Sequence, residues 1–332
     1  MSGARAPKPF ESAGFVDLQV NGFAGVDFND PAISDDDLTH ACDAIWRTGV
    51  TRALPTLITA PLDRFGVCAR RLARFRHRVI AGFHLEGPYI SPLDGYRGAH
   101  PREHIQDASI DDFSRRQEAA DGKIVLVTIA PEVPGAIKLI ELLVQHGVRV
   151  SIGHSAATGA DVQAAVSAGA TLSTHLGNGC AAMLPRHPNV IWEQLAADAL
   201  HASFIVDGHH LPPSTVKVML RAKTLAHSIL VTDAIAAAGQ APGRYRLGNL
   251  HVELSADGRV AAPGSPYLAG SALTLDRAIG NAARFTGHSL DDILPMATTT
   301  PARLIGIEPV GRVRGTWDAE AGQLQVTSVN AA

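Results

Sequence analysis

The chain has 332 residues, of which 46% are hydrophobic and 18% charged, so it contains enough apolar material for a large core. A net charge of −3 excludes the basic field that nucleic-acid binding requires, and no apolar run reaches eighteen residues, so we expect neither a nucleic-acid partner nor a membrane span. Cys42, Cys68 and Cys180 are odd in number and lack CxxC spacing, which indicates reduced thiols and a cytoplasmic protein. The first ten residues lack an apolar segment and are interpreted as a polar arm, not a signal peptide.

Short apolar segments alternate with helical patterns along the first 231 residues. Strands are predicted at residues 15–20, 52–55, 79–85, 124–129, 149–152, 172–173, 203–206 and 229–231. Helices are predicted at residues 34–48, 62–74, 134–146, 159–168 and from 212 onward. Eight buried strands separated by helices favour an α/β protein with a TIM (β/α)8 barrel. A doubly wound open sheet has a similar pattern, and strand counting alone does not separate the two folds.

The pattern changes after residue 231. Residues 244–247 and 250–254 predict antiparallel strands, with Asp257-Gly258 as a hairpin turn. Helices are predicted over 272–286 and from Leu290, and the tail over 312–329 again predicts short strands. We therefore divide the chain into an N-terminal arm, a barrel with a hairpin insertion, and C-terminal strands of a small accessory β domain. The corresponding residues are 1–13, 14–308 with the insertion at about 243–266, and 309–332.

Five chemically capable side chains follow predicted barrel strands: Glu86, His154, His175, His210 and Asp233. Each has an ordinary structural interpretation, since a lone histidine after a strand is more often structural and an aspartate often only caps a helix. In a TIM barrel, however, the ends of the strands meet at one mouth. The coincidence of five such residues therefore favours a functional site over five unrelated structural roles.

The residue types at this mouth indicate metal-assisted hydrolysis. Glu86, His154 and His175 offer a carboxylate and two imidazoles, which suit a divalent ion such as Zn²⁺ with one position left for water. Such a metal lowers the pKa of water from about 15.7 to about 7. Asp233 can then take the water proton and return it to a departing nitrogen. His210 can donate a hydrogen bond to the developing oxyanion, so the sequence predicts hydrolysis of an amide or a similar bond.

Ten segments between Gly14 and Arg303 closely resemble the N-acetylglucosamine-6-phosphate deacetylases of the amidohydrolase superfamily. They are GFVDLQVNGFAGVDF, HLEGPYISP, RGAHP, IAPE, GHSAAT, THLGN, DGHH, LVTDAIAAAG, GRYRLG and LAGSALTLDRAI. The resemblance implies a TIM barrel with a small β domain, one divalent metal (zinc, iron or another) and a homodimer. It also implies an enzyme of amino-sugar metabolism that releases acetate from an amino-sugar phosphate.

Carried over by position, the resemblance implies roles for individual residues. The metal ligands fall on Glu86, His154 and His175, and the catalytic residues fall on Asp233 and His210. Arg186, eleven residues after His175, is expected to bind the phosphate. The expected substrate-binding residues are Ala99, Asn178, Gly179, Arg186, Asp207, His210, Leu268, Ala269 and Gly270.

The chain departs from the family pattern in three respects. Many amidohydrolases have His-x-His on the first strand and bind two metals, whereas this chain has Gln19 and Asn21, so we expect one metal per chain. Gly177 replaces an aromatic residue, and Gly179-Cys180 replaces Ala-Met, so we expect a roomier pocket. The N-terminus is short, so the accessory β domain is expected to be reduced.

Two alternatives to N-acetylglucosamine 6-phosphate deacetylation remain at this point. The same chemistry could act on N-acetylgalactosamine 6-phosphate or on another N-acyl compound. The chain could instead be a non-catalytic binding relative, whose signature would be loss of Asp233 or of the metal ligands, yet all of these residues are present. The metal itself stays open, since zinc, iron and other ions fit such a site and availability often decides.

Overall fold

The computed structural model describes residues 6–265 and 267–331, and its largest element is an eight-stranded parallel sheet. The strand order is β11-β10-β9-β8-β7-β6-β5-β2. A parallel bridge between Val20 and Ala234 brings the two edges together, so the sheet nearly closes into the predicted TIM barrel. The strands are β2 (Phe15–Val20), β5 (Val50–Ile58), β6 (Phe83–Glu86), β7 (Ile124–Ile129), β8 (Arg149–Ile152), β9 (Leu172–Ser173), β10 (His201–Phe204) and β11 (Ser228–Leu230).

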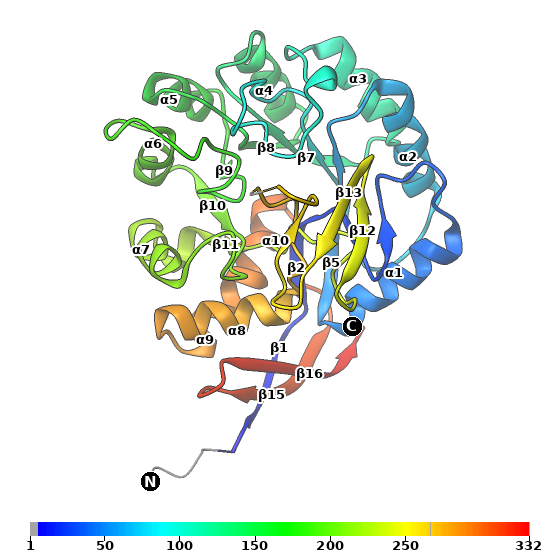
Figure 1. The fold of residues 1–332 in the computed structure, drawn as a ribbon, viewed down its shortest axis with the longest axis vertical. Helices are drawn as coiled ribbons and strands as arrows, with labels where there is room; N and C mark the ends of the chain where they lie inside the picture. Colours follow the sequence, from blue (N-terminus) through cyan, green and yellow to red (C-terminus); the bar gives the residue numbers. More distant parts are fainter. Residues whose placement is uncertain (1–5, 266, 332) are drawn as a thin grey trace.

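Helices surround the strands as an outer ring (Figure 1). Several begin at reciprocal caps: Ser34 accepts from the Asp37 backbone N–H at 3.1 Å, while the Asp37 carboxylate accepts from the Ser34 N–H at 3.0 Å. The α-helices are α1 (Asp35–Arg47), α2 (Leu62–Arg74), α3 (Ile110–Ala119), α4 (Ala136–Gln145), α5 (Gly159–Ser167), α6 (Val190–Ala196), α7 (Pro213–Lys223), α8 (Leu275–Thr286), α9 (Leu290–Ile293) and α10 (Thr299–Ile305). The 3-10 turns are η1 (Arg102–His104), η2 (Leu225–His227) and η3 (Leu294–Ala297).

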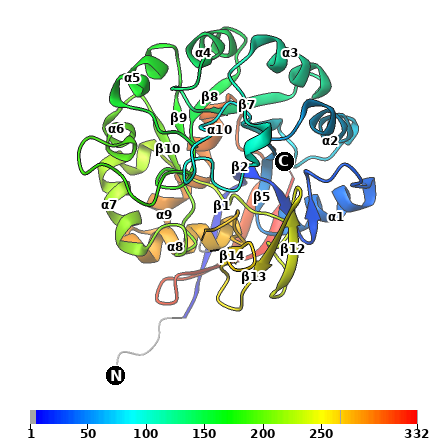
Figure 2. The ribbon, with the colours of Figure 1, turned by 45° about the horizontal axis from the view of Figure 1, so that its top comes forward.

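Three small sheets accompany the barrel (Figure 2). One contains β12 (Gly243–Leu247), β13 (Leu250–Leu254) and β14 (Val260–Ala261), and a second pairs β1 (Lys8–Ala13) with β15 (Arg312–Asp318) and β16 (Gln323–Asn330). A short ribbon joins β3 (Gly22–Phe23) to β4 (Val26–Asp27). The β12–β14 sheet has its own apolar cluster, against which Ile58 and Ala99 pack, and this contact ties the sheet to the barrel mouth.

The strand boundaries differ from the predictions where apolar sequence continues beyond the hydrogen-bonded ladder. β6 begins at Phe83, not at residue 79, since Ile80 makes only an isolated bridge to Ala53. β10 ends at Phe204, although Ile205 and Val206 are also buried.

Other differences concern segments without a clear apolar pattern. Helix α3 was not predicted because it buries only Phe113 and Arg116 and so lacks an apolar stripe. Residues 8–13, assigned to the N-terminal arm, form strand β1, while residues 1–5 of that arm, residue 266 of the hairpin insertion and residue 332 lie outside the described residues. Within the described residues, no helix combines the length and apolar character needed to span a bilayer.

Candidate active site

A cavity of about 530 Å³ lies where the barrel strands end, and all five predicted catalytic and metal-binding residues line it. They reach it from different strand ends: Glu86 closes β6, and His154 and His175 follow β8 and β9. Most of the predicted substrate residues line the same cavity: Ala99, Asn178, Gly179, His210, Leu268, Ala269 and Gly270. Asp207 contacts the cavity through His210, whereas Arg186 is exposed and lies outside the lining.

Three donors converge closely enough to hold a metal ion. The donor atoms of Glu86, His154 and His175 lie within 4.8 Å of one another, and all three residues are buried. Glu86 Oε1 lies 3.0 Å from His175 Nε2 and 3.3 Å from His154 Nε2. One carboxylate and two imidazoles fit a borderline-soft divalent cation.

The hydrogen bond made by His154 fits the role of a metal ligand. His154 Nδ1 donates to the Tyr96 carbonyl at 2.8 Å, which places the ring proton on Nδ1 and leaves the Nε2 lone pair facing Glu86. His175 differs, because its Nδ1 is buried and has no hydrogen-bond partner among the described residues. His154, His175 and Asp233 also have positive φ angles of 50°, 29° and 49°. Such backbone conformations are costly for non-glycine residues and gather at functional sites.

Neutral amides hold the two carboxylates of the site. Gln19 Nε2 donates to Glu86 Oε1 at 2.9 Å and to Asp233 Oδ1 at 3.0 Å. Asn21 Nδ2 donates to Asp233 Oδ1 at 2.7 Å. Because both amides donate to Oδ1, Asp233 Oδ2 has no side-chain hydrogen bond from the described residues. The amides of Gln19 and Asn21 therefore orient the two carboxylates.

Burial and charge shift the pKa values of the site. Burial raises the pKa of Asp233 to about 6, and the negative charge of Glu86 adds to that shift. Burial also opposes ionisation of Glu86, but the neighbouring imidazoles of His154 and His175 hold the pKa of Glu86 well below its usual range. Burial lowers the pKa of His175, yet its hydrogen bond to Glu86 and the negative charges of Glu86 and Asp233 together outweigh burial and raise the pKa. Glu86 is thus the anion of the donor set, and Asp233 is the carboxylate that exchanges a proton more readily.

The Asp207 carboxylate holds His210. Asp207 Oδ2 accepts from His210 Nδ1 at 2.7 Å, and Asp207 Oδ1 accepts from the backbone N–H groups of His209 and His210 at 2.8 Å each. These three bonds fix the imidazole so that its Nε2 edge is free for the cavity. Burial opposes ionisation of Asp207, but its hydrogen bonds with His210 and His209 lower the pKa of this carboxyl.

The structure adds His100 to the site, where the sequence had indicated only the loop that contains it. Its ring packs edge-on against His154 at 4.5 Å between centroids, and Nε2 lies 3.9 Å from Glu86 Oε2. Nδ1 lies 2.8 Å from Thr59 Oγ1. His100 follows no barrel strand, so strand-end counting could not find it. The sequence signal was the RGAHP segment itself.

Two glycines at the cavity are constrained by their neighbours. Gly179 has a φ of +57°, and a Cβ there would lie 2.8 Å from His154 Nδ1. A Cβ on Gly177 would meet Leu211 and Met219 at 3.0 and 3.1 Å. Leu211 and Met219 therefore fill part of the space that an aromatic residue at position 177 would need. Glycine is required at position 179 because the backbone there approaches His154 closely.

A parallel (β/α)8 barrel whose strand ends present a carboxylate–imidazole donor set beside a second carboxylate is the framework of a metal-dependent hydrolase. A profile of the Amidohydrolase family matches residues 11–320. The chain belongs to this family, among the N-acetylglucosamine-6-phosphate deacetylases, as the sequence resemblance indicated.

Individual relatives cover most of the chain. N-acetylgalactosamine-6-phosphate deacetylase of Escherichia coli O157:H7 is 34% identical over 89% of this chain and 78% of its own length. N-acetylglucosamine-6-phosphate deacetylase of Lysinibacillus sphaericus is 33% identical over 93% of this chain and 79% of its own length. The structure of the Mycobacterium smegmatis N-acetyl-D-glucosamine-6-phosphate deacetylase, solved as a mutant in complex with N-acetyl-D-glucosamine-6-phosphate, matches with a TM-score of 0.89 at 31% identity, covering 97% of this chain and 86% of that one.

Proposed function

We propose that this protein hydrolyses the N-acetyl group of N-acetylglucosamine 6-phosphate, giving glucosamine 6-phosphate and acetate. The observation that carries the proposal is the convergence of Glu86, His154 and His175 with Asp233 on one cavity. The names of the related deacetylases supply the substrate class. The test is acetate release by metal-replete protein from 6-phosphorylated and unphosphorylated N-acetylhexosamines. A protein that releases acetate from neither would refute the proposal.

Glu86, His154 and His175 would hold a divalent cation, for which zinc is our first choice and iron the next. When bound, such an ion supplies Lewis acidity, which polarises a carbonyl and makes water acidic near neutral pH. Asp233 accepts the proton of the attacking water as the new C–O bond forms. It then returns that proton to the nitrogen as the C–N bond breaks, so the amine leaves neutral. His210 Nε2 donates to the carbonyl oxygen as negative charge develops there, with Asp207 holding the ring.

We predict one tightly bound metal per chain. Gln19 and Asn21 direct their amide nitrogens at the two carboxylates, so these side chains donate hydrogen bonds and do not complete a second metal site. Elemental analysis of active protein should give one equivalent. The matched variant Gln19→His/Asn21→His restores two imidazoles and should move the content toward two equivalents. Two metals per chain in the active unmodified protein would contradict the prediction.

Arg186 is our candidate for phosphate recognition, because a guanidinium offers paired donors and keeps its charge. Arg186 is exposed and is not among the residues that line the cavity in the observed arrangement. Either the loop between β9 and α6 moves, or a second copy of the chain presents the arginine. We therefore propose a homodimer, since Met183 and Trp192 near Arg186 leave 90% and 48% of their surface exposed.

Arg186→Ala should weaken use of the 6-phosphorylated substrate by about 2 to 4 kcal/mol, the cost of losing one partner of a desolvated charge pair. The unphosphorylated sugar should lose little, because it has no group for the arginine to bind. The comparison is kcat/KM for both sugars in both proteins. Equal losses for the two sugars would make Arg186 a structural residue.

N-acetylgalactosamine 6-phosphate is the second candidate substrate, because a relative that is 34% identical carries that name. The two sugars differ only in the configuration of one hydroxyl group, and the metal and acid–base residues would treat both alike. Parallel kcat/KM measurements on the two epimers separate the candidates. We further propose a cytoplasmic enzyme, a location that suits a phosphorylated substrate and free thiols at Cys42, Cys68 and Cys180.

A further inference from the structure

A second cavity of about 550 Å³ lies at the opposite end of the barrel from the candidate active site. Its wall comes from the segment between α2 and β6 and from the segment between α3 and β7. Both segments precede their strands, whereas Glu86 ends β6, so this cavity opens at the N-terminal ends of the strands. No residue lines both cavities, so a ligand at one would leave the other accessible.

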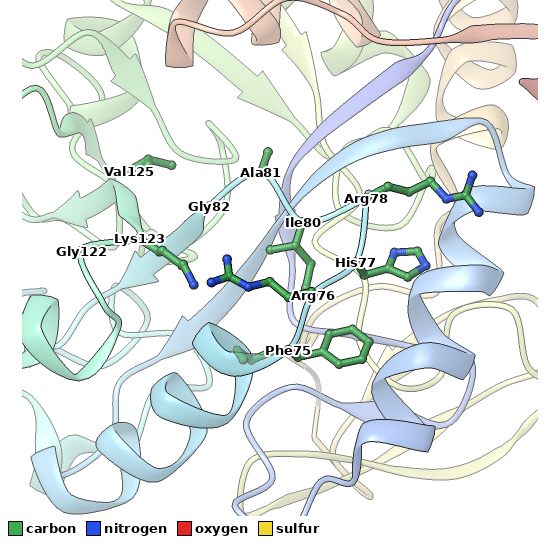
Figure 3. A pocket seen from close by; sticks show the side chains of 11 residues that line it. Phe75, Arg76, His77, Arg78, Ile80, Ala81, Gly82, Gly122, Lys123 and Val125 are labelled. Carbon is green, nitrogen blue, oxygen red and sulfur yellow. The ribbon is translucent and has the colours of Figure 1, made fainter. Parts of the chain in front are cut away.

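Two cationic side chains enter this cavity from the two segments. Figure 3 shows the Arg76 guanidinium and the Lys123 ammonium pointing toward each other. Lys123 Nζ donates to the Ala73 carbonyl and lies 3.3 Å from the Asp121 carboxylate, whose side chain is 72% exposed. In the described part of the chain, Arg76 has neither a hydrogen bond nor an ion pair. Asp121 offsets one of the two converging cations, so the cavity keeps a net positive charge, and Arg76, like Asp121, is exposed to solvent.

The other polar groups of the wall are already paired. Arg78 lies over the Trp46 ring at 4.6 Å, and His77 Nε2 lies 3.3 Å from Asp43 Oδ1. The apolar side chains of Phe75, Ile80 and Val125 line the space between these groups. The cavity thus combines a cationic pair with an apolar wall, in a chain whose net charge is −3. The adjoining helix α2 carries Arg70, Arg71 and Arg74, so this part of the chain is locally basic.

We propose that this cavity binds a small phosphorylated molecule, with its phosphate between Arg76 and Lys123 and its organic part against Phe75 and Ile80. A guanidinium fork matches two phosphate oxygens, and an ammonium adds a point charge. A phosphate also presents three strong acceptor oxygens, so it can accept from the guanidinium and from the ammonium at once, whereas a planar carboxylate offers only two. The volume suits a ligand of metabolite size.

The experiment is calorimetric titration of the full-length protein with phenyl phosphate, which carries the anion and a small apolar ring. Because the candidate active site is also expected to bind phosphate, the informative quantity is the difference between variants. Arg76→Gln should remove one binding site or weaken it by about tenfold or more, the value of a hydrogen bond to a charged group. Arg74→Gln removes the same charge from an exposed position on α2 that does not line the cavity, and it should leave the titration unchanged.

Three outcomes would count against the proposal. Identical titrations of the wild-type and Arg76→Gln proteins would show that the cavity takes no phosphate. An equal loss of phenyl phosphate binding in Arg74→Gln would show that the effect comes from the overall charge and not from a defined binding site. Benzoate carries the same ring with a carboxylate in place of the phosphate. If it binds the Arg76-dependent site as tightly as phenyl phosphate does, the site does not recognise phosphate in particular. None of these results depends on whether the enzyme deacetylates an amino sugar.

Discussion

Glu86→Gln should lower deacetylase kcat/KM by at least about 10³-fold and leave the purified protein with little bound metal. Glu86 is the only anion in the donor set, and its Oε1 lies 3.0 and 3.3 Å from the two imidazole nitrogens. A neutral amide is a poorer ligand for a divalent cation than a carboxylate. Lewis acidity contributes several kcal/mol to such reactions, and each 1.36 kcal/mol is about tenfold in rate. The measurements are metal content by elemental analysis and kcat/KM on N-acetylglucosamine 6-phosphate.

His84→Gln is the matched control for this prediction. His84 lies two residues before Glu86 on β6, so both side chains project from the same side of the strand. Its Nε2 lies 2.7 Å from Thr128 Oγ1, and His84 is not among the residues that line the cavity. This variant should retain metal and most of its activity. If it loses metal as fully as Glu86→Gln does, the effect comes from disturbing the barrel interior and not from removing a ligand.

The strand-end residues could be predicted from sequence because the barrel topology makes distant segments neighbours. Glu86, His154 and Asp233 are far apart along the chain, yet parallel strands bring their carboxyl ends to one mouth. The periodicity of the apolar runs was enough to place those ends within a residue or two. The same logic missed His100, which reaches the donor set from a long loop, and Arg97, which lines the cavity from that loop.

The remaining features of the site depend on three-dimensional packing, which a sequence pattern does not record. A motif can align Arg186 with a phosphate-binding position, but the position of its loop relative to the cavity depends on contacts that no local pattern records. The roles of Gln19 and Asn21 also became clear only from their partners, since an amide can ligate or donate and here both donate to carboxylates. The sequence had indicated only that Gln19 and Asn21 are not metal-binding histidines. The hydrogen bonds show that both side chains donate to the carboxylates of the site.

Asp233→Asn should reduce kcat by about 10² to 10⁴-fold or more while the protein keeps its metal and its fold. The asparagine carbonyl can still accept the hydrogen bonds that Gln19 and Asn21 give to Oδ1, at 3.0 and 2.7 Å in the unmodified protein. An amide cannot accept a proton from water near neutral pH, so the proton transfer is lost while the geometry stays. Single-turnover and steady-state rates, together with metal content, distinguish this effect from loss of the cation.

Asp17→Asn is the matched control for Asp233→Asn. Asp17 is also a buried carboxylate at the same closure of the barrel, and burial raises its pKa to about 7. It accepts from Thr232 Oγ1 at 2.6 Å and does not line the cavity, so its role is to join β2 to the end of β11. Its replacement should retain most of kcat, the reverse of the effect at Asp233. If Asp233→Asn turned over at nearly the wild-type rate, the proton would have to pass through another group, and His210 would be the first to test.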